Sequence, residues 1–296
     1  MDIPTKQLKS GFKLQAYGFG LWQVGGRSEA DRSRDAEEIG AIRYAIGRGV
    51  THFDAAESYG DGHAEELLGE AVRESGVDRK KLILASKVSA WNQRPDDLRR
   101  SLEASLKRLG TDYLDLYLLH RYPEPGIPIE ETMEALDGLV AEGIVKHIGA
   151  CNLSPNRFRE AQKHASNKLV CNQVHYNVQY REAEAAGVLR FCQEIDVLLV
   201  AWRPLQKGAL PETALVRELA GKYGKTPVQV ALNWLLSQDN VVLIAKTSSP
   251  AHLDENLGAL GWVMEDGDVE RIRQEFPGQQ ARSDAVPLDY PADVEA

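Results

Sequence analysis

Four residues that can move protons or hold charge lie where predicted strands give way to loops. Asp54 follows the apolar run VTHF, Lys87 follows KLILAS and His120 follows YLDLYLL, while Tyr59 lies in the loop beyond Asp54. Each has an ordinary explanation when it is taken alone, namely a helix cap, a solvated lysine or a buried histidine. Their occurrence together at the ends of successive strands points instead to acid–base chemistry.

The four side chains complement one another. A tyrosine phenol has a pKa of about 10, and a nearby ammonium group favours the phenolate, so we expect Lys87 to lower the pKa of Tyr59 and make it a usable general acid or base. Asp54 can supply the counter-charge that a buried lysine requires. A neutral His120 can donate a hydrogen bond to a substrate carbonyl. None of these groups supplies a hydride, so carbonyl reduction here would need a bound cofactor.

Eight apolar runs predict the strands that must position these residues. They span residues 17–21, 50–54, 81–87, 113–120, 145–152, 169–176, 196–202 and 241–246. Segments with helical spacing of apolar residues, such as 96–110 and 132–143, lie between them. This alternation predicts an α/β protein with parallel strands, and eight units fit a closed (β/α)8 TIM barrel whose active site lies at the carboxyl ends of the strands. An open doubly wound sheet would need a glycine fingerprint that GFGLWQ and GDGHAE do not complete.

Short segments at both ends of the chain lie outside the predicted barrel. Residues 5–15 are typical of a polar β-hairpin that is too small to fold alone, and we expect it to plug one end of the barrel. Residues 268–276 predict a last helix, and the polar tail 277–296 is expected to be loosely held. Because no repeats or long linkers interrupt the chain, we expect one domain over residues 1–296.

The composition argues against several classes of function. The chain has 296 residues, of which 43% are hydrophobic, and a net charge of -9, which disfavours general binding to nucleic acids or acidic membranes. Its three cysteines are widely spaced and fit neither a zinc site nor a disulfide framework. No apolar run approaches the roughly 20 residues of a membrane span, and the first residues lack a signal core. We therefore expect a cytoplasmic protein that binds a small molecule, with its oligomeric state left open.

Four long motifs resemble the aldo-keto reductase superfamily. FDAAESYGDGHAEELLGEAV, ASKV, SLKRLGTDYLDLYLLH and HIGACNLS occur in the order found in that family, and the resemblance covers essentially the whole chain. It implies a TIM barrel with an N-terminal hairpin, NAD(P)(H) bound across the carboxyl ends of the strands, and reversible reduction of an aldehyde or ketone to an alcohol. It also implies a catalytic tetrad of Asp54, Tyr59, Lys87 and His120, with Tyr59 as the proton donor.

The resemblance further implies a set of cofactor contacts. Asn152 and Gln173 match positions that hold the nicotinamide carboxamide, and Cys151 stands where serine is common. Trp202 matches the aromatic residue that stacks on the nicotinamide ring, and Arg203 is expected to reach the pyrophosphate. The full implied set is Cys151, Asn152, Gln173, Trp202, Arg203, Pro204, Leu205, Lys246, Thr247, Ser248, Ser249, His252, Glu255 and Asn256.

The loop after the eighth predicted strand resembles the family segment that binds the adenosine end. Lys246 and the three hydroxyl residues after it are implied ligands of a 2'-phosphate, and Glu255 and Asn256 are implied adenine contacts. His252 stands where NADP-preferring members often have arginine, and a neutral histidine cannot make the same bidentate contact. Because of Lys246 and the hydroxyl residues we expect NADP(H) to be favoured, and His252 leaves NAD(H) as an alternative. Ser249 also fits an ordinary helix N-cap, which is compatible with phosphate binding.

The substrate side is less specific. Trp22 matches a pocket aromatic of the family, and Trp91 lies just past the third predicted strand, where it could line the pocket or simply pack against neighbours. Together with His120 they form the expected substrate contacts. Arg121 stands where many relatives have tryptophan, and we hypothesise that it favours an anionic or phosphorylated substrate. The alternative is a surface ion pair between Arg121 and Glu124.

Two other functions are compatible with the same residues. Some members of the superfamily act as cofactor-sensing regulatory subunits, and an intact tetrad does not exclude that role. A metal-dependent barrel hydrolase could use Asp54 and His120 as ligands, but Lys87 between them would repel a cation. Reduction of a carbonyl group is the expectation that uses all four residues.

Overall fold

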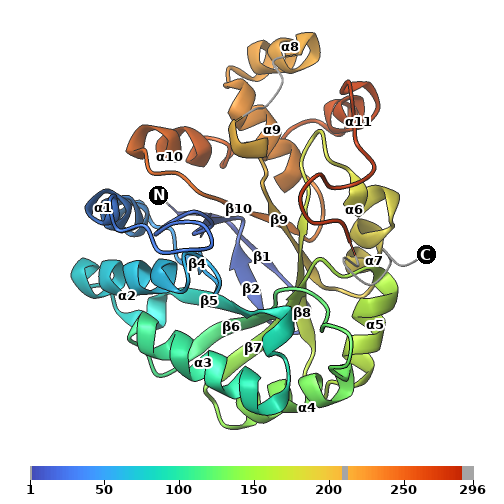
Figure 1. The fold of residues 1–296 in the computed structure, drawn as a ribbon. Coiled ribbons are helices and arrows are strands. Elements are labelled where there is room, and N and C mark those ends of the chain that lie inside the picture. Colours follow the sequence, from blue (N-terminus) through green and yellow to red (C-terminus); the bar gives the residue numbers. More distant parts are fainter. Residues whose placement is uncertain (1, 209–212, 289–296) are drawn as a thin grey trace.

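Eight parallel strands form a closed barrel in the computed structural model of the chain, which describes residues 2–208 and 213–288 (Figure 1). The strands are β3 (Tyr17–Gly20), β4 (His52–Asp54), β5 (Ile83–Val88), β6 (Leu114–Leu119), β7 (Val145–Cys151), β8 (Leu169–His175), β9 (Leu198–Trp202) and β10 (Val241–Ala245). β10 pairs with β3 and so closes the cylinder. Both the eight strands and the TIM barrel were predicted from the sequence, and both are confirmed.

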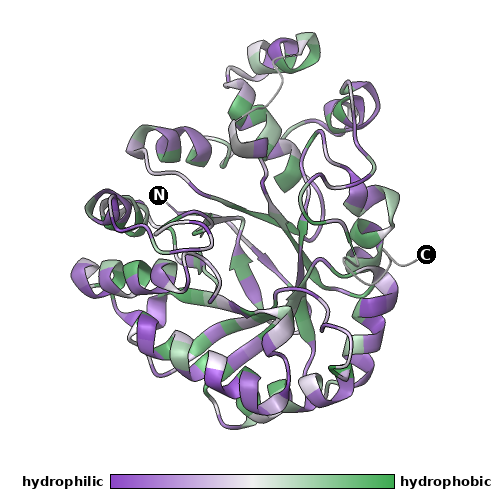
Figure 2. Cartoon of the chain, in the orientation of Figure 1, coloured by the Kyte–Doolittle hydropathy of each residue, from purple (hydrophilic) through white to green (hydrophobic). Residues whose placement is uncertain are grey.

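Helices surround the barrel and cover its outer face. They are α1 (Asp35–Gly47), α2 (His63–Ser75), α3 (Pro95–Leu109), α4 (Ile129–Ala141), α5 (Pro155–Lys163), α6 (Glu182–Ala185), α7 (Val188–Glu194), α8 (Ala214–Tyr223), α9 (Pro227–Leu236), α10 (Pro250–Leu257) and α11 (Asp266–Glu275). Hydrophilic residues lie on their outward faces, and hydrophobic residues follow the strands (Figure 2). In the described ranges, none of these helices has both the length and the apolar character of a membrane span.

Helix α3 illustrates why these segments form where they do. Pro95 occupies the first turn, where its missing N–H costs no hydrogen bond, and Gly110 ends the helix with a positive φ of 65°. Leu98, Leu102 and Leu109 lie on one face and are buried against the barrel. The predicted helix 96–110 is therefore correct to within one residue at each end.

The N-terminal hairpin closes the end of the barrel where the strands begin. β1 (Thr5–Gln7) and β2 (Lys13–Gln15) pair antiparallel, as predicted. Leu8, Phe12 and Leu14 are buried in one cluster with side chains inside the barrel, including Leu116 and Val170. The interior is thus filled by apolar side chains near the hairpin, and polar groups are left to the opposite end.

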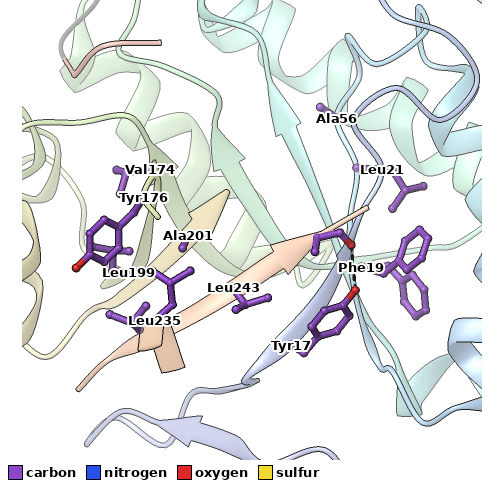
Figure 3. Close-up of a cluster of buried hydrophobic side chains, with 14 of the residues drawn as sticks. Tyr17, Phe19, Leu21, Ala56, Val174, Tyr176, Leu199, Ala201, Leu235 and Leu243 are labelled. Atoms are coloured by element: carbon purple, nitrogen blue, oxygen red, sulfur yellow. Dashed lines mark hydrogen bonds between the residues drawn. The ribbon is translucent and has the colours of Figure 1, made fainter. Parts of the chain in front are cut away.

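A second hydrophobic core lies between the barrel and its helices. Figure 3 shows part of it, with Leu199 of β9 and Leu243 of β10 near Leu235 of α9. The Tyr17 hydroxyl donates a hydrogen bond to the Ala245 carbonyl at 3.4 Å, across the seam where β3 meets β10 (Figure 3). In strands such as β6, alternate residues therefore serve two cores: Leu116 and Leu118 lie in the cluster inside the barrel, and Leu114, Tyr117 and Leu119 lie in the cluster around it.

The described part of the C-terminal tail is held in place rather than loosely attached, so the sequence-based expectation is wrong for these residues. Glu182, at the start of α6, accepts hydrogen bonds from the backbone N–H groups of Ser283 at 2.7 Å and Leu288 at 3.2 Å. Gln280 bonds through its backbone to Gln179 and Arg181. Residues 289–296 of the predicted tail lie outside the described residues.

The first prediction concerns Gly69 of α2, whose lack of a side chain allows α2 and α3 to approach closely. A Cβ atom at this position would lie 2.6 Å from the Leu109 carbonyl oxygen, a backbone atom that cannot rotate away. We expect Gly69→Ala to lower the free energy of unfolding by about 1–3 kcal/mol. The matched control is Gly138→Ala in α4, where a Cβ atom meets nothing within 4 Å and the change should raise stability by about 0.5–1 kcal/mol. Urea denaturation of both variants measures the difference, and equal effects would contradict the packing argument.

Candidate active site

The register of neighbouring strands brings the predicted catalytic residues to one rim. Asp54 ends β4, Lys87 lies near the end of β5, and His120 follows β6, with its backbone N–H bonded to the Val88 carbonyl at 2.9 Å. β4 pairs with β5, and β5 pairs with β6, so the three residues come from adjacent strands. Since all strands are parallel, these ends meet at the same end of the barrel, opposite the hairpin.

Lys87 is the centre of this group and is completely buried. Its Nζ atom donates hydrogen bonds to Asp54 Oδ1 at 2.5 Å, to the Ala55 carbonyl at 2.7 Å and to the Tyr59 hydroxyl at 3.2 Å. An ammonium group has three N–H donors, so these partners satisfy all of them. The ordinary reading of Lys87 as a solvated surface residue is therefore excluded.

Tyr59 is held by aromatic contacts as well as by Lys87. Its ring lies edge-on to Trp22, with centroids 5.1 Å apart, and edge-on to His120 at 5.6 Å. The Lys87 Nζ atom lies 4.8 Å from the centroid of the same ring. The phenol and the imidazole thus face a common space next to the ammonium group.

Burial sets the protonation states of the site. It raises the pKa of Tyr59 to about 12, because the loss of solvation outweighs the opposing effect of the Lys87 charge. The prediction that Lys87 would lower this pKa is therefore wrong in its net sign, and the tyrosine is a protonated phenol. Burial alone would lower the pKa of Lys87, but the nearby Asp54 and Tyr59 raise it above its usual value. Burial, with the charges of Lys87 and Arg121, holds the pKa of His120 well below its usual value, so the imidazole is neutral.

Gln173 contacts the catalytic group directly, which the sequence did not predict. Its Nε2 atom donates a hydrogen bond to Asp54 Oδ2 at 2.8 Å, from β8 on the other side of the barrel. Both carboxylate oxygens of Asp54 are therefore occupied, one by Lys87 and one by Gln173. The Gln173 Oε1 atom is not used in this bond and can accept one from a ligand.

Asn152 and Trp202 lie beside the same rim. Asn152 has a positive φ of 60°, donates from Nδ2 to the His120 carbonyl at 3.3 Å and accepts at Oδ1 from Trp202 Nε1 at 3.1 Å. Cys151 precedes it and is buried inside the barrel. The structure thus brings the implied carboxamide contacts and the implied stacking residue together next to His120.

The resemblance implies cofactor contacts for all three residues after Trp202, but the surroundings of these residues differ in the structure. Arg203 Nη1 lies 3.4 Å from Asp284 Oδ1, so in this structure it pairs with a carboxylate of the tail. Pro204 is buried, and Leu205 packs against the outer hydrophobic core. These last two side chains therefore serve the packing of the loop.

The implied adenosine end divides into accessible and internal side chains. Ser249 caps α10 by accepting from the His252 N–H at 3.4 Å, which confirms the N-cap reading. Thr247 Oγ1 accepts from the Ser249 N–H, and Asn256 is buried with Nδ2 bonded to Tyr17. Lys246, with its Nζ 3.9 Å from the buried Glu38 carboxylate, and the side chains of Ser248, His252 and Glu255 are at least partly exposed.

The two tryptophans on the substrate side are among the most exposed large hydrophobic residues of the described chain. Trp22 is 41% exposed and Trp91 is 59% exposed. For Trp91 this disfavours the alternative of a simple packing residue. Arg121 is half-buried, and its carbonyl accepts a hydrogen bond from Gln93 Nε2 at 3.0 Å, which fixes the backbone next to His120.

The residues at the rim fit a nicotinamide dinucleotide by their donor chemistry. Gln173 Oε1 and the second N–H of Asn152 Nδ2 can bond the two ends of a carboxamide, and Trp202 carries an aromatic ring beside them. Lys246 follows β10 directly and supplies a cation at the same end of the barrel. In contrast, no cluster of three or more His, Cys, Asp or Glu side chains among residues 2–208 and 213–288 is placed to hold a metal ion.

Sequence reasoning missed two residues that contact the predicted set, Glu38 and His175, and a third, Ser283, that bonds to His175. Glu38 lies near Lys246, and His175 stacks on Trp202. His175 lies two residues beyond Gln173 on β8, and this spacing is a signal that could have placed it on the same face. Glu38 and Ser283 have no comparable local signal.

Comparisons with known proteins agree with this geometry. The family model described as the aldo/keto reductase family matches residues 16–275. The chain is 33% identical over 283 residues to methylglyoxal reductase YeaE of Escherichia coli K12, covering 94% of this chain and 96% of that protein. It is 31% identical over 269 residues to glyoxal reductase of Bacillus subtilis, covering 90% and 91%.

Solved structures show the same fold. A thermostable aldo-keto reductase in complex with the inhibitor epalrestat is 41% identical, with a TM-score of 0.88 over 91% of this chain and 98% of that one. An aldo/keto reductase of Klebsiella pneumoniae in complex with NADP and acetate is 30% identical, with a TM-score of 0.82 over 97% and 100%.

The buried ion pair generates a second prediction. Asp54→Leu removes the counter-charge of Lys87 and leaves an ammonium group in the barrel without it, so the free energy of unfolding should fall by about 3–5 kcal/mol. The double variant Asp54→Leu/Lys87→Met removes both charges and should recover most of that loss. Urea denaturation measures both, and a double variant no more stable than Asp54→Leu would contradict the account of Lys87 as a charge held by Asp54.

Proposed function

Since the chain belongs to the aldo/keto reductase family, we propose that it reduces a small aldehyde or ketone to an alcohol with NADP(H), with Tyr59 as the proton donor. The observation that carries the assignment of roles is the buried Lys87, which bonds Asp54, Ala55 and Tyr59 at once. Of the three groups that Lys87 bonds, only the Tyr59 hydroxyl carries a proton that can be given to a substrate.

The side chains divide the reaction between them. When bound, NADPH supplies the hydride that no side chain can provide. Tyr59 gives its phenolic proton to the carbonyl oxygen, and the Lys87 ammonium, 3.2 Å away, stabilises the phenolate that remains. Neutral His120 donates a hydrogen bond to the same oxygen and orients it. Asp54 keeps Lys87 charged and in place throughout.

The proposed cofactor site extends along the rim from the catalytic group. Asn152 and Gln173 would hold the carboxamide, Trp202 would stack on the nicotinamide ring, and Lys246 would meet the 2'-phosphate. The preference for NADP(H) is supported by solved relatives from Klebsiella pneumoniae, which are complexes with NADP and NADPH. Lys246 supports it as well, because it is the cation at the implied phosphate position.

The proposed substrates are small aldehydes and ketones, including dicarbonyl aldehydes. Relatives that cover most of the chain are named methylglyoxal reductase and glyoxal reductase, which supports this class. The exposed indoles of Trp22 and Trp91 offer apolar walls, and the half-buried Arg121 offers a charge for an anionic group. The proposed partners of the protein are therefore the cofactor and a small-molecule substrate.

We also propose a cytoplasmic location and a single domain. Cys151, Cys171 and Cys192 are all free and buried, which suits a reducing compartment. The hairpin contacts the barrel through a buried cluster, and the described tail contacts His175 of β8 and Glu182 of α6 through hydrogen bonds, which supports one folding unit.

A third prediction tests Tyr59. Tyr59→Phe removes the proton donor and keeps the ring, so kcat for reduction of methylglyoxal should fall by at least about 100-fold while the Kd for NADPH stays within about twofold. Steady-state kinetics and calorimetry measure the two quantities. The matched control is Tyr113→Phe, a tyrosine that directly precedes β6 at the end of the barrel where the strands begin, and it should leave both unchanged. Full activity in Tyr59→Phe would overturn the mechanism.

A fourth prediction tests Arg121. Arg121→Leu should lower kcat/KM by about tenfold for an aldehyde that carries a carboxylate and leave a neutral aldehyde of similar size nearly unchanged. Arg121→Lys keeps the charge and should retain part of the preference. Arg190→Leu, in an exposed pair with Glu194, is the control for loss of a surface arginine. The hypothesis fails if Arg121→Leu changes the two substrates by the same factor.

A further inference from the structure

The indole of Trp202 stacks on a second aromatic ring, the imidazole of His175. His175 of β8 and Trp202 of β9 are register partners in neighbouring parallel strands. Their rings are nearly parallel, with centroids 4.5 Å apart and an interplanar angle of 12°. The ring of Tyr180 stacks on the other face of His175, at 4.7 Å and 22°. The imidazole is thus held between two aromatic rings, one of which is the proposed nicotinamide contact.

The edge of the His175 ring is fixed by hydrogen bonds. Nδ1 lies 2.8 Å from Ser283 Oγ in the tail, and Nε2 lies 3.3 Å from Gln206 Oε1 in the loop after β9. Ser283 Oγ already accepts the N–H groups of Ala285 and Val286, each at 3.1 Å, so its own proton is left to donate to Nδ1. Nε2 then carries the ring proton and donates it to Gln206 Oε1. The Asn177 Nδ2 atom also lies 3.3 Å from Nε2, but it donates its shorter hydrogen bond to the Arg203 carbonyl at 2.9 Å.

Neighbouring charges keep this arrangement. Gln206 Nε2 donates to Asp284 Oδ2 at 3.3 Å, which leaves Gln206 Oε1 as the acceptor that His175 needs. Asp284 also pairs with Arg203 at 3.4 Å, and it lies 3.8 Å from His175 Nδ1. Burial, and the charge of Arg203, lower the pKa of His175 to about 4, so the ring is neutral and has the single proton that this pattern requires.

Trp202 is therefore restrained in three ways, one of them by Arg203, whose guanidinium carbon lies 5.5 Å from the centroid of the indole. Its Nε1 donates to Asn152 Oδ1, which limits rotation of the indole within its plane. The stack on His175 limits the tilt of that plane. A ring that is already oriented loses less conformational freedom when a ligand stacks on it.

We propose that His175, anchored by Ser283 of the C-terminal tail, is a positioning residue that sets the plane of Trp202 for stacking on the nicotinamide ring. The proposal rests on the proposed function, because it needs Trp202 to meet the cofactor. It assigns to residues 283–284 a role in cofactor binding, although they are more than 80 residues from Trp202 in the sequence.

The test compares the Kd for NADPH, measured by calorimetry, in His175→Leu, His175→Phe and Ser283→Ala. His175→Leu removes the stacked ring and should raise this Kd by about threefold to tenfold, with kcat at saturating NADPH within about twofold of the parent. His175→Phe keeps a ring and should raise it less. Ser283→Ala, a mild change in the tail, should raise it in the same direction. His147→Leu is the matched control, because His147 contacts Phe12 edge-on at the opposite end of the barrel and its loss should not change the Kd.

A double-mutant cycle separates positioning from general destabilisation. Trp202→Leu alone should weaken NADPH binding, and adding His175→Leu to it should then have almost no further effect, because there is no longer a ring to position. If His175→Leu raises the Kd by the same factor in both backgrounds, or leaves it unchanged in the parent while Trp202→Leu weakens binding, the inference fails and the proposed function stands. If Trp202→Leu itself leaves the Kd unchanged, the proposed stacking by Trp202 fails together with the inference.

Discussion

A fully buried ammonium group imposes the strictest requirement in this molecule. Lys87 has three N–H donors and no contact with water, so three acceptors must meet it inside the barrel. One comes from the end of β4, one from the backbone just beyond it and one from the loop that carries Tyr59. The end of β4, the Lys87 side chain of β5 and residues 55–59 are therefore held together around one charge, and this places the Tyr59 hydroxyl beside Lys87.

The parts that the sequence could predict depend on patterns within a few residues of one another. Each barrel strand is an apolar run, and Asp54, Lys87 and His120 are recognisable because each follows such a run directly. Parallel strands place their carboxyl ends together, so local patterns are enough to gather the three residues at one rim. The boundaries were less exact: the helix predicted over 132–143 is α4, Ile129–Ala141, whose first turn includes the buried Ile129, four residues before Met133.

Two kinds of feature could not be predicted from the sequence. One is the net result of opposing effects on a pKa, and the other is contact between residues far apart in the chain. The sign of the Tyr59 pKa shift depends on whether burial or the Lys87 charge is stronger, and neither can be read from spacing. The bond from Gln173 to Asp54 crosses the barrel between residues 119 positions apart. The tail looked unstructured because its residues are polar, yet Glu182 offers a carboxylate that its backbone N–H groups can bind. A polar segment is ordered here by a partner rather than by its own composition.

The hairpin that closes one end of the barrel limits how substrate and product can reach and leave the interior. Leu8, Phe12 and Leu14 close the end of the barrel where the strands begin, in one buried cluster with interior side chains that include Leu116 and Val170. Tyr59 lies at the other end of the barrel, so substrate and product would share the mouth at that end. A site with one shared mouth must release its product before it admits the next substrate, so exchange at the mouth is a step of each turnover in addition to the chemistry.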